Sequence, residues 1–67
     1  MSEQDVYNQL IQDIKTTKER EMWYRKSVIQ TPALHEFLDP LIERLMKDAI
    51  SMQDAAAAIR GRFPNVA

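Results

Sequence analysis

The residues with the most evident chemical potential lie near the middle of the chain. His35, the only histidine, precedes Glu36 and Asp39, and on a helix His35 and Asp39 would lie one turn apart. This arrangement resembles part of a zinc-binding helix, in which imidazole and carboxylate groups hold the metal. A second histidine and a third ligand are missing, and Asp39 is expected to cap a helix that starts at Pro40. We therefore predict a connector histidine and no metal site.

A second candidate is the basic stretch Lys15–Lys26, which holds five basic and two acidic residues. Clustered lysine and arginine side chains bind the phosphates of nucleic acids. The whole chain carries a net charge of −1, however, and these bases spread around most of a helix, whereas nucleic-acid-binding domains present a strongly basic surface. Nucleic acid is not the expected partner. An oligomeric nucleic-acid-binding regulator that uses Lys15–Lys26 remains the alternative function.

Catalytic chemistry finds little support in the composition. The sequence contains one glycine, one histidine and no cysteine. One glycine cannot form a phosphate-binding loop, and the sequence offers no nucleophile beside a base and no pair of catalytic carboxylates. We expect a protein that is not an enzyme, without catalytic residues and without residues that bind a cofactor.

Helices must position these side chains, because helix-forming residues dominate and turn residues are few. Ser2 and Asp5 predict an N-cap with a capping box, so we expect the first helix from residue 3 to residue 29. No breaker occurs within this range. The first half of the chain should therefore be one long helix.

Two proline signals follow the first helix. Thr31-Pro32 and Asp39-Pro40 are each typical of an N-cap followed by the first residue of a helix. Together they predict a short connector helix from Pro32 to about Leu38 and a longer helix that begins at Pro40. A single kinked helix through both prolines is the alternative.

We expect residues 40–60 to form one helix, and a break near residue 51 is the alternative. Gly61 has the residue type and the sequence position expected just after the end of a helix. Phe63 would pack back on this helix, and Pro64 would prevent it from continuing. Residues 1–67 would then form a single helical domain, in which residues 62–67 are a flexible tail.

Seam residues recur along both helices at alternating steps of three and four, which is the pattern of a coiled coil. Thr17 and Glu21 are the polar interruptions of this seam. When the chain turns at Pro32, the two stripes pair in an antiparallel register that sets Val28 against Leu38. The sequence thus predicts an all-α fold, an antiparallel helical hairpin that assembles into a helical bundle. The two stripes are Tyr7, Leu10, Ile14, Thr17, Glu21, Tyr24 and Val28, then Leu38, Ile42, Leu45, Ala49, Met52, Ala56, Ile59 and Phe63.

Charge favours the same orientation. Residues 1–14 carry acids and no base, and the antiparallel register brings them toward Arg60 and Arg62. Such exposed pairs contribute about 0–1 kcal/mol each, so they select an orientation more than they stabilise it.

Several apolar residues fall off the seam and predict an interface. Trp and Arg are frequent interface anchors, and Trp23 is difficult to cover within a hairpin. Glu21 lies on the seam, where it either pairs with Arg25 or Arg44 or fixes the register and the oligomeric state. The predicted interface consists of Met22, Trp23, Tyr24, Arg25, Met46 and Ile50, with Glu21 as a residue of seam specificity.

The chain length favours self-association. A protein of 67 residues buries a small core, and without cysteine it has no disulfide to stabilise it. We expect a homo-oligomer, with a dimer favoured, and in addition a protein partner. The polar, acidic N-terminus and the absence of a long apolar run predict a cytoplasmic protein with no membrane contact. The expected function is therefore a small interaction protein that self-associates and binds, caps or inhibits a partner, as a regulator or an assembly adaptor of the kind found among bacterial or phage accessory factors.

Overall fold

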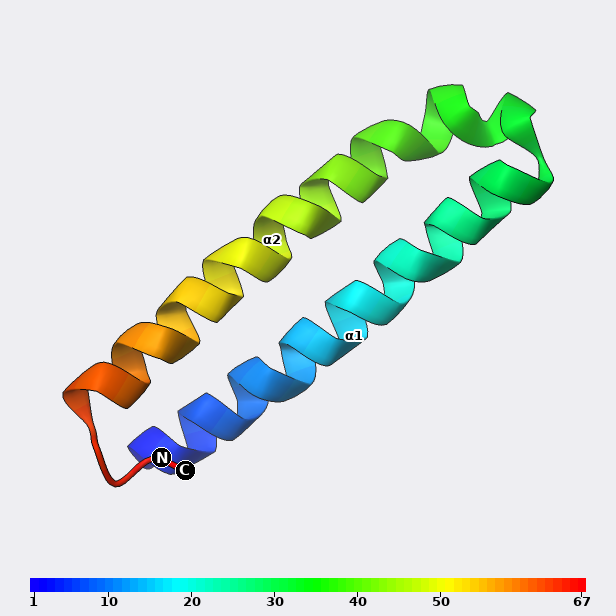
Figure 1. Ribbon diagram of the computed structural model, residues 1–67. Coiled ribbons are helices and arrows are strands. Elements are labelled where there is room, and N and C mark those ends of the chain that lie inside the picture. Colours follow the sequence, from blue (N-terminus) through cyan, green and yellow to red (C-terminus); the bar gives the residue numbers. More distant parts are fainter.

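The computed structural model describes residues 1–67 as two long helices that lie side by side (Figure 1). Helix α1 spans Glu3–Gln30 and helix α2 spans His35–Arg62, and a single 3₁₀ turn, η1 at Pro32–Leu34, joins them. The helices run antiparallel, so the two ends of the chain lie at the same end of the hairpin. The structure contains no strand and confirms the predicted all-α helical hairpin.

Helix α1 begins at the predicted capping box. The backbone N–H of Asp5 donates to Ser2 Oγ at 3.2 Å, and the backbone N–H of Ser2 donates to Asp5 Oδ2 at 3.3 Å. These two bonds satisfy N–H groups that the first turn of a helix leaves without partners. The helix ends at Gln30, one residue beyond the expected end, where the N–H of Thr31 donates to the carbonyl of Ser27 at 2.8 Å.

The connector is shorter than the sequence predicts. The expected helix from Pro32 to Leu38 is reduced to one 3₁₀ turn, and α2 then runs without a break through Asp39 and Pro40. The prediction of an N-cap at Asp39 is therefore wrong, because the Asp39 carboxylate instead lies against Nδ1 of His35. Pro40 is the sixth residue of α2, where its missing N–H removes one bond near the helix start. Because the helical turns continue without a break through Pro40, Leu38 stays on the side of α2 that faces α1.

The end of α2 also differs from the prediction. Gly61 lies inside the helix with ordinary helical geometry, and α2 ends at Arg62, where the N–H of Phe63 donates to the carbonyl of Ile59 at 2.8 Å. No left-handed residue is needed, because this bond closes the last turn. The chain then turns back toward α1, with Val66 buried at 7% exposure and the N–H of Ala67 donating to Gln4 Oε1 at 3.0 Å. The predicted flexibility of residues 62–67 stays a prediction.

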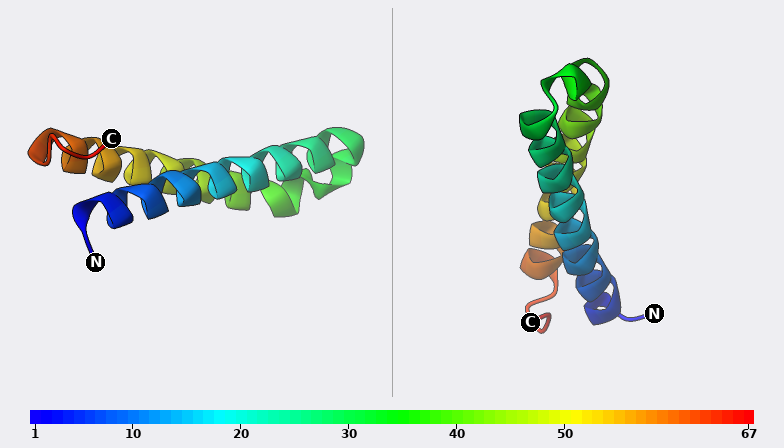
Figure 2. Two further views of the ribbon diagram at one scale, coloured as in Figure 1. Left: turned by 90° about the horizontal axis from the view of Figure 1, so that it is seen from below. Right: turned by 90° about the vertical axis from the view of Figure 1, so that its right-hand side faces the viewer.

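The hydrophobic core follows the predicted seam. The four buried residues within the helices are Ile14, Ile42, Ala49 and Ala56, and all four are seam residues. The other seam positions are half-buried, apart from Phe63, which is exposed at the end of the stripe. The two helices cross each other at a shallow angle near their middle (Figure 2), as coiled-coil packing requires. This burial pattern confirms that the two predicted stripes face each other, and the predicted pairing of individual residues stays a prediction.

The hairpin leaves most of its surface in contact with solvent. Five of 67 residues are buried, and no side chain is fully covered. The three ion pairs all join residues four apart in one helix, so the expected attraction between helices does not take the form of direct ion pairs. Neither helix has an apolar stretch that could span a lipid bilayer. The seam alone therefore accounts for most of the packing between α1 and α2.

Candidate protein-interaction surface

One side of the hairpin carries an apolar groove between α1 and α2. The groove has a volume of about 330 Å³. Met22 of α1 and Ile50 of α2 form its walls and remain 67% and 56% exposed. Large apolar side chains with such exposure are seldom gathered on one side of a small soluble domain unless they contact something. The lining residues are Lys18, Glu21, Met22, Met46, Ala49, Ile50 and Gln53.

The groove continues toward the open end of the hairpin. A second depression of about 460 Å³ shares Gln53 with the first, and Ile11 and Ala57 form its apolar walls. Ile29 extends the same side toward the turn, because it lies seven residues, two helical turns, after Met22. We call this side the groove face and define it by its exposed apolar residues: Ile11, Met22, Ile29, Met46 and Ile50.

A polar link crosses the groove face. Arg25 Nε donates to Glu21 Oε2 at 3.1 Å, and Arg25 Nη2 donates to Met46 Sδ on the other helix at 2.9 Å. The Glu21 side chain is 21% exposed, so the carboxylate on the seam turns out toward water and its partner. This geometry agrees with the simpler of the two interpretations of Glu21, pairing with Arg25. A role of Glu21 in fixing the oligomeric state stays a prediction.

The predicted interface residues separate into two groups. Met22, Met46 and Ile50 line the groove, and Arg25 contacts Met46 across it. Trp23 does not line the groove, because consecutive residues of a helix point about 100° apart. Trp23 is 65% exposed and lies edge-on against Tyr24, with 5.7 Å between the ring centroids.

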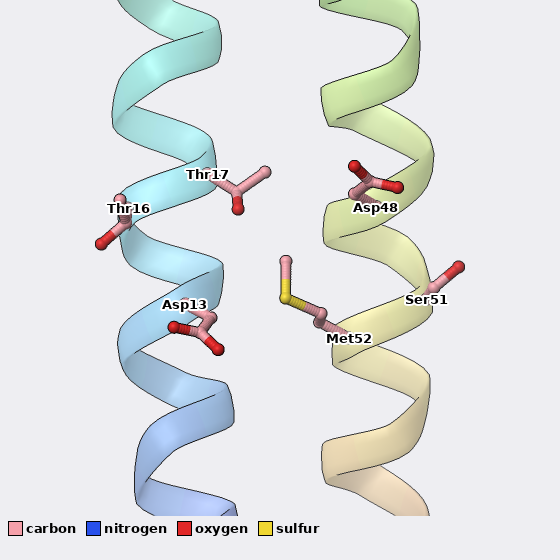
Figure 3. Close-up of a pocket in the computed structure, with 6 residues that line it drawn as sticks. All are labelled: Asp13, Thr16, Thr17, Asp48, Ser51 and Met52. Carbon is pink, nitrogen blue, oxygen red and sulfur yellow. The ribbon is translucent and has the colours of Figure 1, made fainter.

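The opposite side of the hairpin is polar near its middle. Thr17 of α1 and Met52 of α2 point into the gap between the helices, and Asp13 and Asp48 lie beside the gap, in front of their own helices (Figure 3). Thr16 and Ser51 also line this depression of about 410 Å³, but they point away from the gap. We call this side the aspartate face and define it by Asp13, Thr16, Thr17, Asp48, Ser51 and Met52.

The chain matches no protein-family model, no curated protein and no solved structure.

The aspartate face was not identified from the sequence. Asp13 and Asp48 are separated by 35 positions, and neither lies in a recognisable motif. The signal that could have found them is the register itself, since both residues directly flank the seam on the same side. Their carboxylates can accept hydrogen bonds, but no group of three or more histidine, aspartate or glutamate side chains gathers anywhere in the molecule to hold a metal.

The remaining chemical candidates lie apart from one another. His35 and Asp39 form an exposed pair at the start of α2. Of the basic residues in Lys15–Lys26, Lys18 lies at the rim of the groove and Arg25 is engaged by Glu21. The structure thus brings together one extended apolar face with a basic edge, and it does not bring together a cluster of groups suited to catalysis.

Proposed function

We propose that this chain is a non-enzymatic protein-interaction module that self-associates through its groove face and binds, caps or inhibits a further protein partner. The observation that carries this proposal is the groove itself, in which Met22, Met46 and Ile50 stand exposed between two helices. Covering such a side chain contributes roughly 1.5–3 kcal/mol. Burial of a few such side chains can therefore supply the free energy of association. This contribution adds to the small stability that the core alone gives to the folded chain.

The small core supports the same proposal. A chain of this size has a small core and no disulfide, and association of two hairpins into a four-helix bundle would add to its stability. The surface outside the groove face would then be free for a protein partner. A regulator or an assembly adaptor of this kind requires no catalytic group.

The test compares two adjacent residues of α2. Ile50 lies on the groove face and Ser51 lies on the aspartate face, so Ile50→Asp and Ser51→Asp introduce the same side chain about 100° apart on one helix, one variant on each face. Light scattering over a concentration series should give the wild type and Ser51→Asp about twice the 7.8 kDa chain mass. Ile50→Asp should weaken the dimer at least about 100-fold, because association then buries a carboxylate.

The result has a clear opposite. If the wild type has the mass of a single chain at every concentration, self-association is wrong. If Ser51→Asp disrupts the dimer as strongly as Ile50→Asp does, the groove face is not the interface. Circular dichroism of both variants, which should remain helical, excludes general unfolding as the cause.

A further inference from the structure

The solvent-exposed area of the hairpin is larger than that of a compact monomer. The chain exposes 5223 Å², whereas a compact protein of 7.8 kDa exposes about 4,400 Å². The difference of about 820 Å² is comparable to the roughly 800 Å² that each partner contributes to an interface of standard size. The elongated hairpin thus has enough additional surface for one side of a dimer interface.

The groove face has the size for a second hairpin. The molecule measures 47 Å by 16 Å across its broad side, which corresponds to a footprint of about 750 Å². The apolar residues of the groove face extend from Ile11 to Ile29, over about 27 Å of that length. A face two helices wide packs on another such face as two layers of a four-helix bundle.

The distribution of charge distinguishes between the two symmetric arrangements in which two copies can pack on this face. The basic residues Lys15, Lys18 and Arg25 lie at steps of three and seven along α1, so they share its groove-facing edge. In one arrangement, the two-fold axis runs perpendicular to the long axis of the hairpin, across the groove face. It would set this edge of α1 against the same edge of the partner's α1. Lys15 would then approach the partner's Arg25. Glu21 offsets only one of the three basic charges on this edge, so the contact of two such edges opposes association.

A two-fold axis along the hairpin brings opposite charges together. In that arrangement α1 packs against the partner's α2 at the same level. Asp39 precedes Met46 by seven residues and lies on the same edge of α2, and Glu43, three residues before Met46, lies beside that edge toward the outer side of α2. The antiparallel register places Arg25 level with both acids. Their present pairs, with His35 and Lys47 of their own helix, are exposed and therefore weak.

We infer that a second copy of this chain covers the groove face, related by a two-fold axis parallel to the long axis of the hairpin. In this dimer α1 of each copy packs on α2 of the other, and Met22 lies against the partner's Met46. Arg25 lies between the partner's Asp39 and the partner's Glu43. The inference rests on the proposed function, because it specifies how the groove face is used in self-association.

Cysteine cross-linking tests the arrangement directly. The chain has no cysteine, so each variant with one introduced thiol can form a disulfide only between two copies. Met22→Cys and Met46→Cys proteins are mixed, allowed to exchange subunits and oxidised. The control mixture combines Ile11→Cys with Ile29→Cys, two positions of α1 that meet only when the axis runs across the hairpin. Mass spectrometry identifies the linked chains.

The axis along the hairpin predicts that the Met22→Cys and Met46→Cys mixture links at least about tenfold more than the control mixture. A dimer in which the control mixture links preferentially, or in which neither mixture links, overturns this arrangement and leaves self-association intact. A single-chain mass in light scattering overturns both the arrangement and self-association. The two failures are therefore distinguishable.

Discussion

The two sides of the hairpin flank the same seam and differ sharply in chemistry. On the groove face, Met22 and Ile50 expose large apolar side chains around an open channel. On the aspartate face, Asp13 and Asp48 place carboxylates at the corresponding gap (Figure 3). Packing of α1 on α2 does not require this difference, because the buried residues of both helices belong to the seam. The flanking positions are thus free to serve contacts outside the hairpin.

The energetic consequence differs between the two faces. Covering the groove face removes apolar area from water, which contributes about 25 cal/mol per Å². Covering the aspartate face would remove two carboxylates from water, which is costly unless a partner supplies donors or positive charge. A copy of this face supplies the hydroxyl groups of Thr16, Thr17 and Ser51 as donors, but no positive charge. The groove face is therefore the side on which two identical chains can meet.

The largest expected effect comes from breaking the seam that both faces share. Ile42 is 8% exposed and packs between the helices. Replacement by Asp loses about 1.5–3 kcal/mol of apolar burial and adds an unpaired buried charge that costs about 3–5 kcal/mol. A domain of this length has a stability of about 3–10 kcal/mol in total. We expect Ile42→Asp to abolish cooperative thermal unfolding in circular dichroism.

The matched control for this variant is Ile50→Asp, which introduces the same residue at an exposed position of the same helix. It should retain a cooperative transition at low concentration, where the hairpin is not associated. If Ile42→Asp unfolds at the wild-type temperature, the seam is not the source of stability, and the distinction between a folding seam and two free faces is wrong.

The sequence was sufficient for the seam and insufficient for the helix boundaries. Ile14, Ile42, Ala49 and Ala56 were predictable, because the alternation of three and four continues through both halves and only one register aligns them at Pro32. Periodicity reports which side of a helix is apolar over many turns. A prediction from periodicity is therefore less sensitive to a single unusual residue than a prediction from a short motif.

The prolines and the glycine show where local rules fail. Asp39-Pro40 has the form of a helix start, but the helix begins five residues earlier, and Pro40 lies near enough to that start that it removes only one backbone hydrogen bond. Gly61 has the residue type of a helix end, but the helix continues for two residues beyond the expected end, without a left-handed backbone at Gly61. The contact of Ala67 with Gln4 joins opposite ends of the sequence and has no local signal.

The second largest effect is expected from a variant in which both faces of the hairpin carry apolar side chains. Asp13→Leu combined with Asp48→Leu would make the aspartate face apolar. Each hairpin would then carry two apolar sides, and association could propagate from both. We expect assemblies larger than a dimer, whose mass in sedimentation velocity increases with concentration.

The control for this variant is Asp13→Asn combined with Asp48→Asn, which removes the two charges without adding apolar area. It should have the wild-type mass. If the leucine variant also keeps the wild-type mass, exposed apolar area on a flank is not sufficient for association, and the argument from the groove face loses its physical basis.

The smallest expected effect concerns Trp23, which the sequence places in the interface and the structure places outside the groove. Trp23 contacts Tyr24 edge-on, a pair that contributes about 0.5–1.5 kcal/mol to stability. Trp23→Ala should lower the stability of the hairpin by about this amount and leave its dissociation constant unchanged within about twofold. Met22→Ala, one residue earlier on the groove face, should weaken the dimer about tenfold or more. Equal weakening by both variants would show that the interface extends around α1 to Trp23, and the groove face would then be only part of it.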